Sequence, residues 1–347
     1  MHHVSLEFRH IAHAYGEIAA LEGISFTAPA GEITCLLGAS GCGKSTLLNL
    51  AAGLLKVQEG AVYVGGALLA DQGHHPPPEK RPVGLVFQEG ALFPHMTIAA
   101  NIGFGLPRAR QGEVAGWLEA VGLAGMGDRY PHALSGGQQQ RAALARAMAP
   151  GPQVLLMDEP FASVDIVLRR KLRRDCRMLL RARGTTTLLV THDPAEALDI
   201  ADRIAVMEDG RIVQFGTPFD LHDAPATAAV GAIFSGAQIV PGVTGEGGFV
   251  TAFGIWPLAA AKDTVAERLL PPGRHVDLLV HADRLDLVSD DAGLSVVDIH
   301  PVGGITRVLL EGAGGAQITV ETPVSVSAGV RYRIVPQAHS LRAFPGD

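Results

Sequence analysis

The 347-residue sequence has few cysteines and few basic residues, and each shortage excludes a class of protein. Its three cysteines, Cys35, Cys42 and Cys176, are odd in number and irregularly spaced, which predicts neither a disulfide framework nor a zinc site. Basic residues are also scarce, 28 against 35 acidic ones, and a net charge of -7 has the wrong sign for a surface that grips a nucleic-acid backbone. We therefore expect reduced thiols and no nucleic-acid partner.

Long apolar runs are missing as well. The longest stretch without a charged residue, 224–245, is interrupted by Pro225, Pro241 and several glycines, so it would make a poor membrane-spanning helix. The first residues lack the apolar segment that a secretory signal needs. We therefore expect the protein to remain in the cytosol.

What the sequence does contain, over residues 4–215, is an alternation of short apolar runs with helical stretches. This alternation is typical of βαβ units, and runs that are apolar throughout indicate a parallel sheet buried on both faces. The signals between residues 87 and 154 are mostly helical, with candidates at 98–106, 113–121 and 135–148, which predicts a helical subdomain at about 88–152 inside a doubly wound α/β core. The strand candidates are 32–37, 83–87, 154–158, 187–191 and 203–207.

The composition changes after about residue 235. Short β-type runs then recur between glycines and prolines, a pattern that predicts a small all-β barrel or sandwich. The length of the chain also fits two domains, which we place at 1–235 and 236–347. The runs are 277–280, 285–288, 295–299, 307–310, 317–320 and 332–335.

Residues 38–45, called the phosphate loop below, match the pattern of a loop that binds phosphate between a strand and a helix. Its glycines let successive backbone N–H groups surround an anion, and the helix that begins near Lys44 directs its positive end to the same place. Lys44 is expected to neutralise the β- and γ-phosphates, while the Ser45 hydroxyl binds Mg²⁺. The loop consists of Gly38, Ala39, Ser40, Gly41, Cys42, Gly43, Lys44 and Ser45.

Two acidic residues, Asp158 and Glu159, follow the buried run 154–157. Ligands of an open parallel sheet bind beyond the carboxyl ends of its strands, so both side chains should face the nucleotide. Asp158 would hold Mg²⁺ through water, and Glu159 would act as the general base that polarises the attacking water. Alone, such a pair is weak evidence, but behind a phosphate loop it predicts phosphoryl transfer to water.

A second helix start also has the chemistry of an anion site. Ser135 is a natural N-cap of an alanine-rich helical stretch, and Gly136 and Gly137 leave backbone N–H groups free. Taken alone, this segment is better interpreted as an ordinary capped helix. Because the phosphate loop already holds one nucleotide, we predict that this start serves the ATP of a second copy, so that two ATPs lie between two head-to-tail chains.

The set of motifs as a whole resembles that of the ABC transporter ATPases. The phosphate loop, Leu-Ser-Gly-Gly-Gln at 134–138, Asp-Glu-Pro at 158–160, Gln88 after one strand and His192 after another have that family's order and spacing, over residues 4 to about 235. The resemblance implies a P-loop (RecA-like) ATPase core that binds ATP and Mg²⁺ and works as a homodimer on membrane permease subunits.

Particular roles follow from this resemblance. It implies that Tyr15 stacks on adenine, that Gln88 senses Mg²⁺ and the membrane partner, and that His192 contacts the γ-phosphate, as the catalytic set Glu159, His192, Gln88 and Lys44. Thr46, Gln138 and Asp165 join the nucleotide-binding set in the same way, Asp165 in a loop that crosses the dimer interface. In that loop the chain reads Phe-Ala-Ser-Val-Asp at 161–165 where Phe-Ser-Ala-Leu-Asp is common, a departure that keeps the aspartate and changes the residues that pack beside it.

Within the family, segments 88–97 and 129–132 look like the importer branch that carries a C-terminal TOBE-type (OB-like) domain, and most closely like the ATPases of ferric-iron importers. The implied function is an ATPase at the cytoplasmic face of the inner membrane that energises ferric-iron uptake, with a periplasmic solute-binding protein as an indirect partner. Spermidine/putrescine, thiamine and sulfate remain alternative solutes, because the ATPase does not touch the solute.

Two other functions stay open at this level. An ABC-type ATPase of DNA repair or translation would usually carry long coiled-coil insertions or two cassettes, whereas this sequence has one cassette and no heptads. The β-rich tail could also be a regulatory sensor for a small anion or metabolite, a role compatible with the motor.

Overall fold

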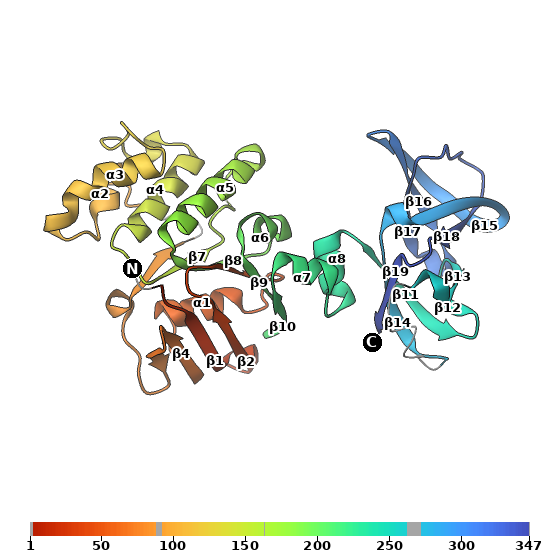
Figure 1. Cartoon of the computed structure of the whole chain (residues 1–347), viewed down its shortest axis with the longest axis horizontal. Coiled ribbons are helices and arrows are strands. Elements are labelled where there is room, and N and C mark those ends of the chain that lie inside the picture. The colour runs from red at the N-terminus through yellow and green to blue at the C-terminus, as the bar shows by residue number, and fades with distance from the viewer. Residues whose placement is uncertain (1–2, 88–91, 163, 262–271, 347) are drawn as a thin grey trace. The chain divides into compact units, whose positions relative to one another are not determined.

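The computed structural model describes residues 3–87, 92–162, 164–261 and 272–346. The chain forms two compact units, Met1–Phe219 and Asp220–Asp347 (Figure 1). Segment 220–235, which the sequence assigned to the first domain, groups with the second unit. No helix of the described residues is both long enough and apolar enough to cross a membrane.

The first unit is built around a six-stranded sheet in the order β10-β9-β3-β8-β7-β6. All neighbours in it are parallel except the antiparallel pair β9 and β10. Every residue of β3 and β8 is buried, as expected for a sheet covered on both faces. The predicted α/β core is confirmed. The strands are β3 (Ile33–Leu37), β6 (Val83–Val86), β7 (Val154–Asp158), β8 (Thr186–Thr191), β9 (Arg203–Glu208) and β10 (Arg211–Gly216).

A second, antiparallel sheet in the order β2-β1-β4-β5 was not anticipated from the sequence. Its strands are buried on alternate residues, and its apolar face packs with helix α1 and the parallel sheet in one core. Helix α1 therefore lies between two sheets, which holds the start of the helix at a defined place (Figure 1). The elements are β1 (Leu6–Tyr15), β2 (Ile18–Ala28), β4 (Glu59–Val64), β5 (Ala67–Asp71) and α1 (Lys44–Ala52).

Helices lie on the other face of the parallel sheet, where α4 contacts β6 and α6 contacts β3 and β8 (Figure 1). The predicted helical subdomain is present as α2, α3 and α4. Helix α2 ends at Gly103 rather than at residue 106, because Pro107 disfavours a helical conformation just before it. The elements are α2 (Ile98–Gly103), α3 (Val114–Ala120), α4 (Gly136–Met148), α5 (Ile166–Arg183), α6 (Pro194–Ile200), η1 (Pro78–Lys80), η2 (Arg108–Glu113) and η3 (Pro131–Ala133).

The second unit has an all-β core, as predicted, and two short helices precede this core in the chain. Its two sheets have the orders β13-β12-β11-β14-β19 and β17-β16-β15-β18, and their inner faces share one core around the fully buried Trp256. The runs predicted at 285–288 and 295–299 are one long strand, β15, whose pairing with β18 shifts register between Ser289 and Leu294.

The helices of this unit are α7 (Pro218–Asp223), which begins just before the division, and α8 (Ala228–Ser235). Its remaining elements are β11 (Gln238–Gly245), β12 (Gly248–Thr251), β13 (Gly254–Trp256), η4 (Leu258–Ala260), β14 (His275–Val280), η5 (Ala282–Arg284), β15 (Leu285–Val302), β16 (Ile305–Glu311), η6 (Ala313–Gly315), β17 (Gln317–Thr322), β18 (Tyr332–Pro336) and β19 (Leu341–Pro345).

Candidate active site

The phosphate loop connects β3 to α1 at the carboxyl edge of the parallel sheet. Gly43 precedes the helix with φ 101°, in the left-handed region, and a Cβ at this position would collide with the Ala20 carbonyl oxygen. Only glycine fits such a turn without strain. The turn leaves the first N–H groups of α1 directed out of the helix end, where an anion can accept them.

Lys44 is only 5% exposed, although it is charged. Its Nζ donates a hydrogen bond to the Ala39 carbonyl oxygen at 2.6 Å and lies 3.6 Å from Cys42 Sγ. The ammonium group is therefore folded back over its own loop. A buried cation held over the loop that begins a helix is the chemistry expected for a triphosphate site.

Ser45 and Asp158 meet across this edge. The Ser45 hydroxyl donates to Asp158 Oδ1 at 3.2 Å. Burial raises the pKa of the Asp158 carboxyl group and Glu159 acts in the same direction, while Ser45 and Lys44 oppose the shift. A hydroxyl and a half-buried carboxylate that lack a full neutralising partner fit a hard cation such as Mg²⁺, which takes few protein oxygens and completes its shell with phosphate and water.

Glu159 and His192 follow the adjacent parallel strands β7 and β8, so their side chains lie at the same edge. Glu159 Oε1 and His192 Nδ1 are 3.0 Å apart. Glu159 has a positive φ of 40°, a strained conformation for a residue with a side chain, and its N–H donates to the Val190 carbonyl oxygen at 3.0 Å. The strain directs the carboxylate out of the strand, where it can accept a proton.

A buried charge network supports the segment after β8. Arg173 of α5 is 5% exposed and pairs with Asp193, the N-cap of α6, and with Glu196 and Asp199 within that helix. Thr191 ties the network to the strand, because its hydroxyl donates to Glu196 Oε2 at 3.1 Å. The sequence analysis missed this network, since nothing in the sequence distinguishes Arg173 from the other arginines of an arginine-rich amphipathic helix.

Burial raises the pKa of Glu196 to about 7, and the attraction of Arg173 only partly offsets that effect. Three acids thus share one buried guanidinium group beside His192. The network holds the loop that carries His192 while the imidazole itself stays 54% exposed.

Tyr15 lies at the end of β1, near the first turn of α1. Its hydroxyl is 3.4 Å from Thr46 Oγ1, and the ring of His13 meets it edge to face with centroids 4.9 Å apart. The Tyr15 side chain is half exposed, so an aromatic surface is available beside the phosphate loop.

Ser135, Gly136 and Gln138 lie at the start of α4 and Asp165 at the start of α5. The Ser135 N–H donates to Gln138 Oε1 at 2.9 Å, which closes one side of the cap, while Ser135, Gly136 and Asp165 are exposed. Among the described residues, none of 135–138 hydrogen-bonds to the phosphate loop. At the second helix start, Ser135 and Gly136 are therefore open to solvent, whereas Gly137 is buried. Gln88 lies outside the described residues.

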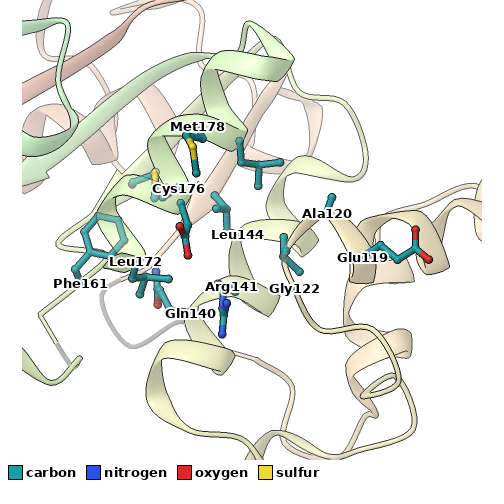
Figure 2. A pocket seen from close by; sticks show the side chains of 14 residues that line it. Glu119, Ala120, Gly122, Gln140, Arg141, Leu144, Phe161, Leu172, Cys176 and Met178 are labelled. Atoms are coloured by element: carbon teal, nitrogen blue, oxygen red, sulfur yellow. The ribbon is translucent and has the colours of Figure 1, made fainter. Parts of the chain in front are cut away.

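A cavity of about 420 Å³ lies behind these motifs, between α3, α4 and α5 (Figure 2). Gln140 and Cys176 are among its lining residues. Gln140 is 4% exposed and its Nε2 has no hydrogen-bond partner in the described structure. Burial raises the pKa of the Cys176 thiol far above its ordinary value, so this cysteine stays protonated.

Segment 161–165 departs from the sequence that is common in the family, and the structure describes it on both sides of residue 163. Phe161 and Val164 are buried, so both apolar positions of the loop contribute to packing. Arg169 of α5 donates to the Val164 carbonyl oxygen at 2.9 Å through Nη2 and at 3.2 Å through Nε. The backbone before Asp165 is thus held by side-chain hydrogen bonds.

Comparison with known proteins agrees with this geometry. A family model described as ABC transporter matches residues 21–162. The Fe(3+) ions import ATP-binding protein FbpC of Pseudomonas fluorescens is 39% identical, with 99% of each chain covered. The chain belongs to the ABC transporter ATP-binding family. The sulfate/thiosulfate import ATP-binding protein CysA 1 of Chromobacterium violaceum is 38% identical, covering 99% of this chain and 98% of its own.

Solved structures point the same way. An ATP-binding cassette of an ABC transporter in its ADP conformation has a TM-score of 0.57 and 27% identity, covering 67% of this chain and 99% of its own. A dimeric cassette in a post-hydrolysis state with ADP and Pi has a TM-score of 0.52 and 29% identity, covering 61% and 98%. The predicted fold class, the ATPase family and the resemblance to importer ATPases, iron importers among them, are confirmed. The solute, the TOBE assignment and the individual site roles stay predictions.

Proposed function

We propose that this chain is the ATP-hydrolysing subunit of an ABC import complex, and that the complex imports ferric iron. The observation that carries the ATPase assignment is the meeting of Ser45 with Asp158, and of Glu159 with His192, at the edge where the Lys44 loop ends. These pairs provide a phosphate site, a cation site and a base in one place.

In this mechanism the phosphate loop and Lys44 hold the β- and γ-phosphates of ATP, and Tyr15 stacks on the adenine. Glu159 accepts a proton from the attacking water, and His192 donates a hydrogen bond to the γ-phosphate as charge develops. Mg²⁺ would be held by Ser45 and Asp158, with Gln88 as a further ligand, and would neutralise phosphate charge. Segment 135–138 and Asp165 contact the ATP that is bound to the partner copy.

We place the complex at the cytoplasmic face of the inner membrane, where permease subunits hold two copies of this chain head to tail. The start of α4 supports the dimer, because Ser135 and Gly136 are exposed there and, among the described residues, make no hydrogen bond to the phosphate loop, so that the helix end is accessible to a second nucleotide. The ferric-iron assignment rests on relatives of that name over the full length. Sulfate is the second candidate, because the sulfate/thiosulfate import ATP-binding protein is nearly as similar to this chain over almost the same length.

Glu159→Gln tests the motor. Loss of the base should lower hydrolysis about 100-fold or more while ATP binding survives, because both phosphate-binding helix ends are intact. Sizing chromatography with Mg-ATP should then show a stable dimer. The exposed Glu79 offers a matched control, and Glu79→Gln should leave hydrolysis unchanged. A Glu159→Gln chain that hydrolyses ATP at the parent rate would refute the assignment.

The solute is tested in cells that lack this chain. Uptake of radioactive ferric iron should fall on deletion and return with the parent sequence, but not with Lys44→Ala. Sulfate uptake measured in the same cells decides between the two candidates. Sulfate uptake that depends on the chain while iron uptake does not would replace ferric iron by sulfate and leave the ATPase assignment standing.

A further inference from the structure

The second unit contains a cavity of about 370 Å³ that is lined by none of the residues assigned to the ATP site. Its walls come from the ends of α7, α8 and β14, from η5, and from the turn between β18 and β19. The charged and imidazole side chains that line it are His222, Asp223, His281, Arg284, His339 and Arg342.

The cavity has a firmly packed floor. Arg342 of β19 pairs in register with Leu279 of β14, so their side chains share one face of the sheet. Leu279 is buried and also lines the cavity. Helix α8 packs directly on it, since a Cβ at Gly231 would collide with Leu279 Cδ2. Arg342 therefore lines the cavity from a well-packed sheet.

The rim is tied to the same framework. The Gln337 N–H donates to the Arg284 carbonyl oxygen at 3.0 Å, and the Ser340 hydroxyl donates to the Gln337 carbonyl oxygen at 2.6 Å. These bonds hold η5 beside the turn between β18 and β19. Arg284 and Arg342 are thus brought to one cavity from segments far apart in the sequence.

Positive charge in this cavity is poorly neutralised. Arg342 makes no ion pair among the described residues, and Arg284 approaches Asp283 only at 3.9 Å, with both side chains largely exposed, which is worth little. The one lining acid, Asp223, already accepts from His222 Nδ1 at 2.8 Å.

The pKa of the His281 imidazole responds to the same positive charge. Burial lowers the pKa of His281, and His222, Arg284 and Arg342 lower it further, while Asp283 opposes them. The histidines could suggest a metal site instead. However, the described residues contain no cluster of three His, Cys, Asp or Glu with the geometry for a metal ion, and two guanidinium groups would repel a cation.

We propose that this cavity binds a small multivalent oxyanion, held by Arg284 and Arg342. Guanidinium groups bind phosphate, sulfate and carboxylate oxygens through paired N–H donors, and the histidines that line the cavity add further donors at the rim. The volume lies in the range of small-molecule sites. Because its walls come from five elements, a bound anion would also stabilise the fold of this unit.

Titration calorimetry on the full chain tests the proposal, with Mg-ADP present so that the phosphate loop is filled. Inorganic phosphate, sulfate and succinate are titrated separately at constant ionic strength, which distinguishes tetrahedral oxyanions from dicarboxylates. We expect one-to-one binding of at least one of them, with a dissociation constant of about 1 mM or lower. Arg342→Gln and Arg284→Gln should each weaken that binding about tenfold or more.

Arg331→Gln is the matched control, because Arg331 is an exposed arginine of the same unit that does not line the cavity. It should bind the anion as the parent does. If Arg342→Gln fails to fold, the exposed Arg284 decides the question by itself. The proposal is overturned if none of the three anions binds, or if the folded variants bind them as tightly as the Arg331→Gln control.

Discussion

The two units collect charge for an anion in different ways. In the first unit the site is built on backbone geometry: a loop between β3 and α1, and residues that directly follow β7 and β8. In the second unit, side chains converge from five elements with no local pattern. Sites whose groups follow one another in the chain leave a motif, whereas sites assembled by packing do not.

The largest expected effect tests whether the start of α4 is also a backbone-built site, one that serves the partner's nucleotide. Ser135→Arg should abolish hydrolysis, because its bulk blocks the approach of a phosphate to the helix end. Binding of a fluorescent ATP analogue to dilute monomer should be nearly unchanged. A variant that loses monomer binding as completely as Lys44→Ala would show that the helix start serves its own nucleotide.

Mixed dimers sharpen this test. A Ser135→Arg chain paired with a Lys44→Ala chain carries both lesions in one composite site, and the other site stays whole. We expect this pair to retain hydrolysis that neither homodimer shows, measured on dimers purified through two different affinity tags.

The next prediction concerns the independence of the two units. Each has its own core, so a chain that ends at Phe219 should fold and bind ATP without the second unit. A chain that ends at Ser235 retains α7 and α8 without the sheet on which α8 packs, and should expose apolar surface. The two fragments are compared by their nucleotide binding and by the binding of a dye that detects exposed apolar surface. Loss of ATP binding by both fragments would mean that the β unit completes the motor.

A smaller effect tests the side-chain network inside the first site. With a pKa of about 7 when folded and about 4.5 when unfolded, Glu196 holds a proton in the folded state that it loses on unfolding. Its contribution to stability therefore declines as pH rises through this interval. The free energy of unfolding of the Glu196→Gln variant, relative to that of the parent, should therefore rise by about 2 kcal/mol between pH 5 and pH 8.

Denaturant unfolding at the two pH values measures this difference. Glu79→Gln changes an exposed carboxylate and should show no such pH dependence. A Glu196→Gln chain that is less stable relative to the parent at pH 8 than at pH 5 would contradict the assignment of burial as the dominant cause.

The smallest effect concerns the cavity behind the motifs. Gln140→Met removes an amide N–H that has no partner in the described structure, so the free energy of unfolding should be unchanged or rise by about 1 kcal/mol. The neighbouring Gln139 donates to the carbonyl oxygens of Pro131 and Leu134, and Gln139→Met should instead lose about 1 kcal/mol. Equal losses in both variants would show that Gln140 has a partner.

Particular residues show how far sequence reasoning reached. Strand and loop signals around Lys44, Asp158 and Glu159 predicted that these residues face one nucleotide, because ligands of an open parallel sheet bind beyond the carboxyl ends of its strands. The role of His192 came only from the family resemblance. The antiparallel sheet of β1, β2, β4 and β5 was missed, since its alternating pattern was interpreted only as part of βαβ units. The register shift in the pairing of β15 with β18 was missed as well, because register depends on the partner strand.

By itself the sequence determined the family, the parallel core and the phosphate loop, because each depends on residues that are neighbours in the chain or on a periodicity of buried positions. Only the tertiary structure decided that Arg173 holds three acids beside His192, that Gln140 is buried without a partner, and that Arg284 and Arg342 share one cavity. These arrangements bring together side chains from distant segments, and the packing of helices and strands, rather than local order in the chain, sets the distances between them.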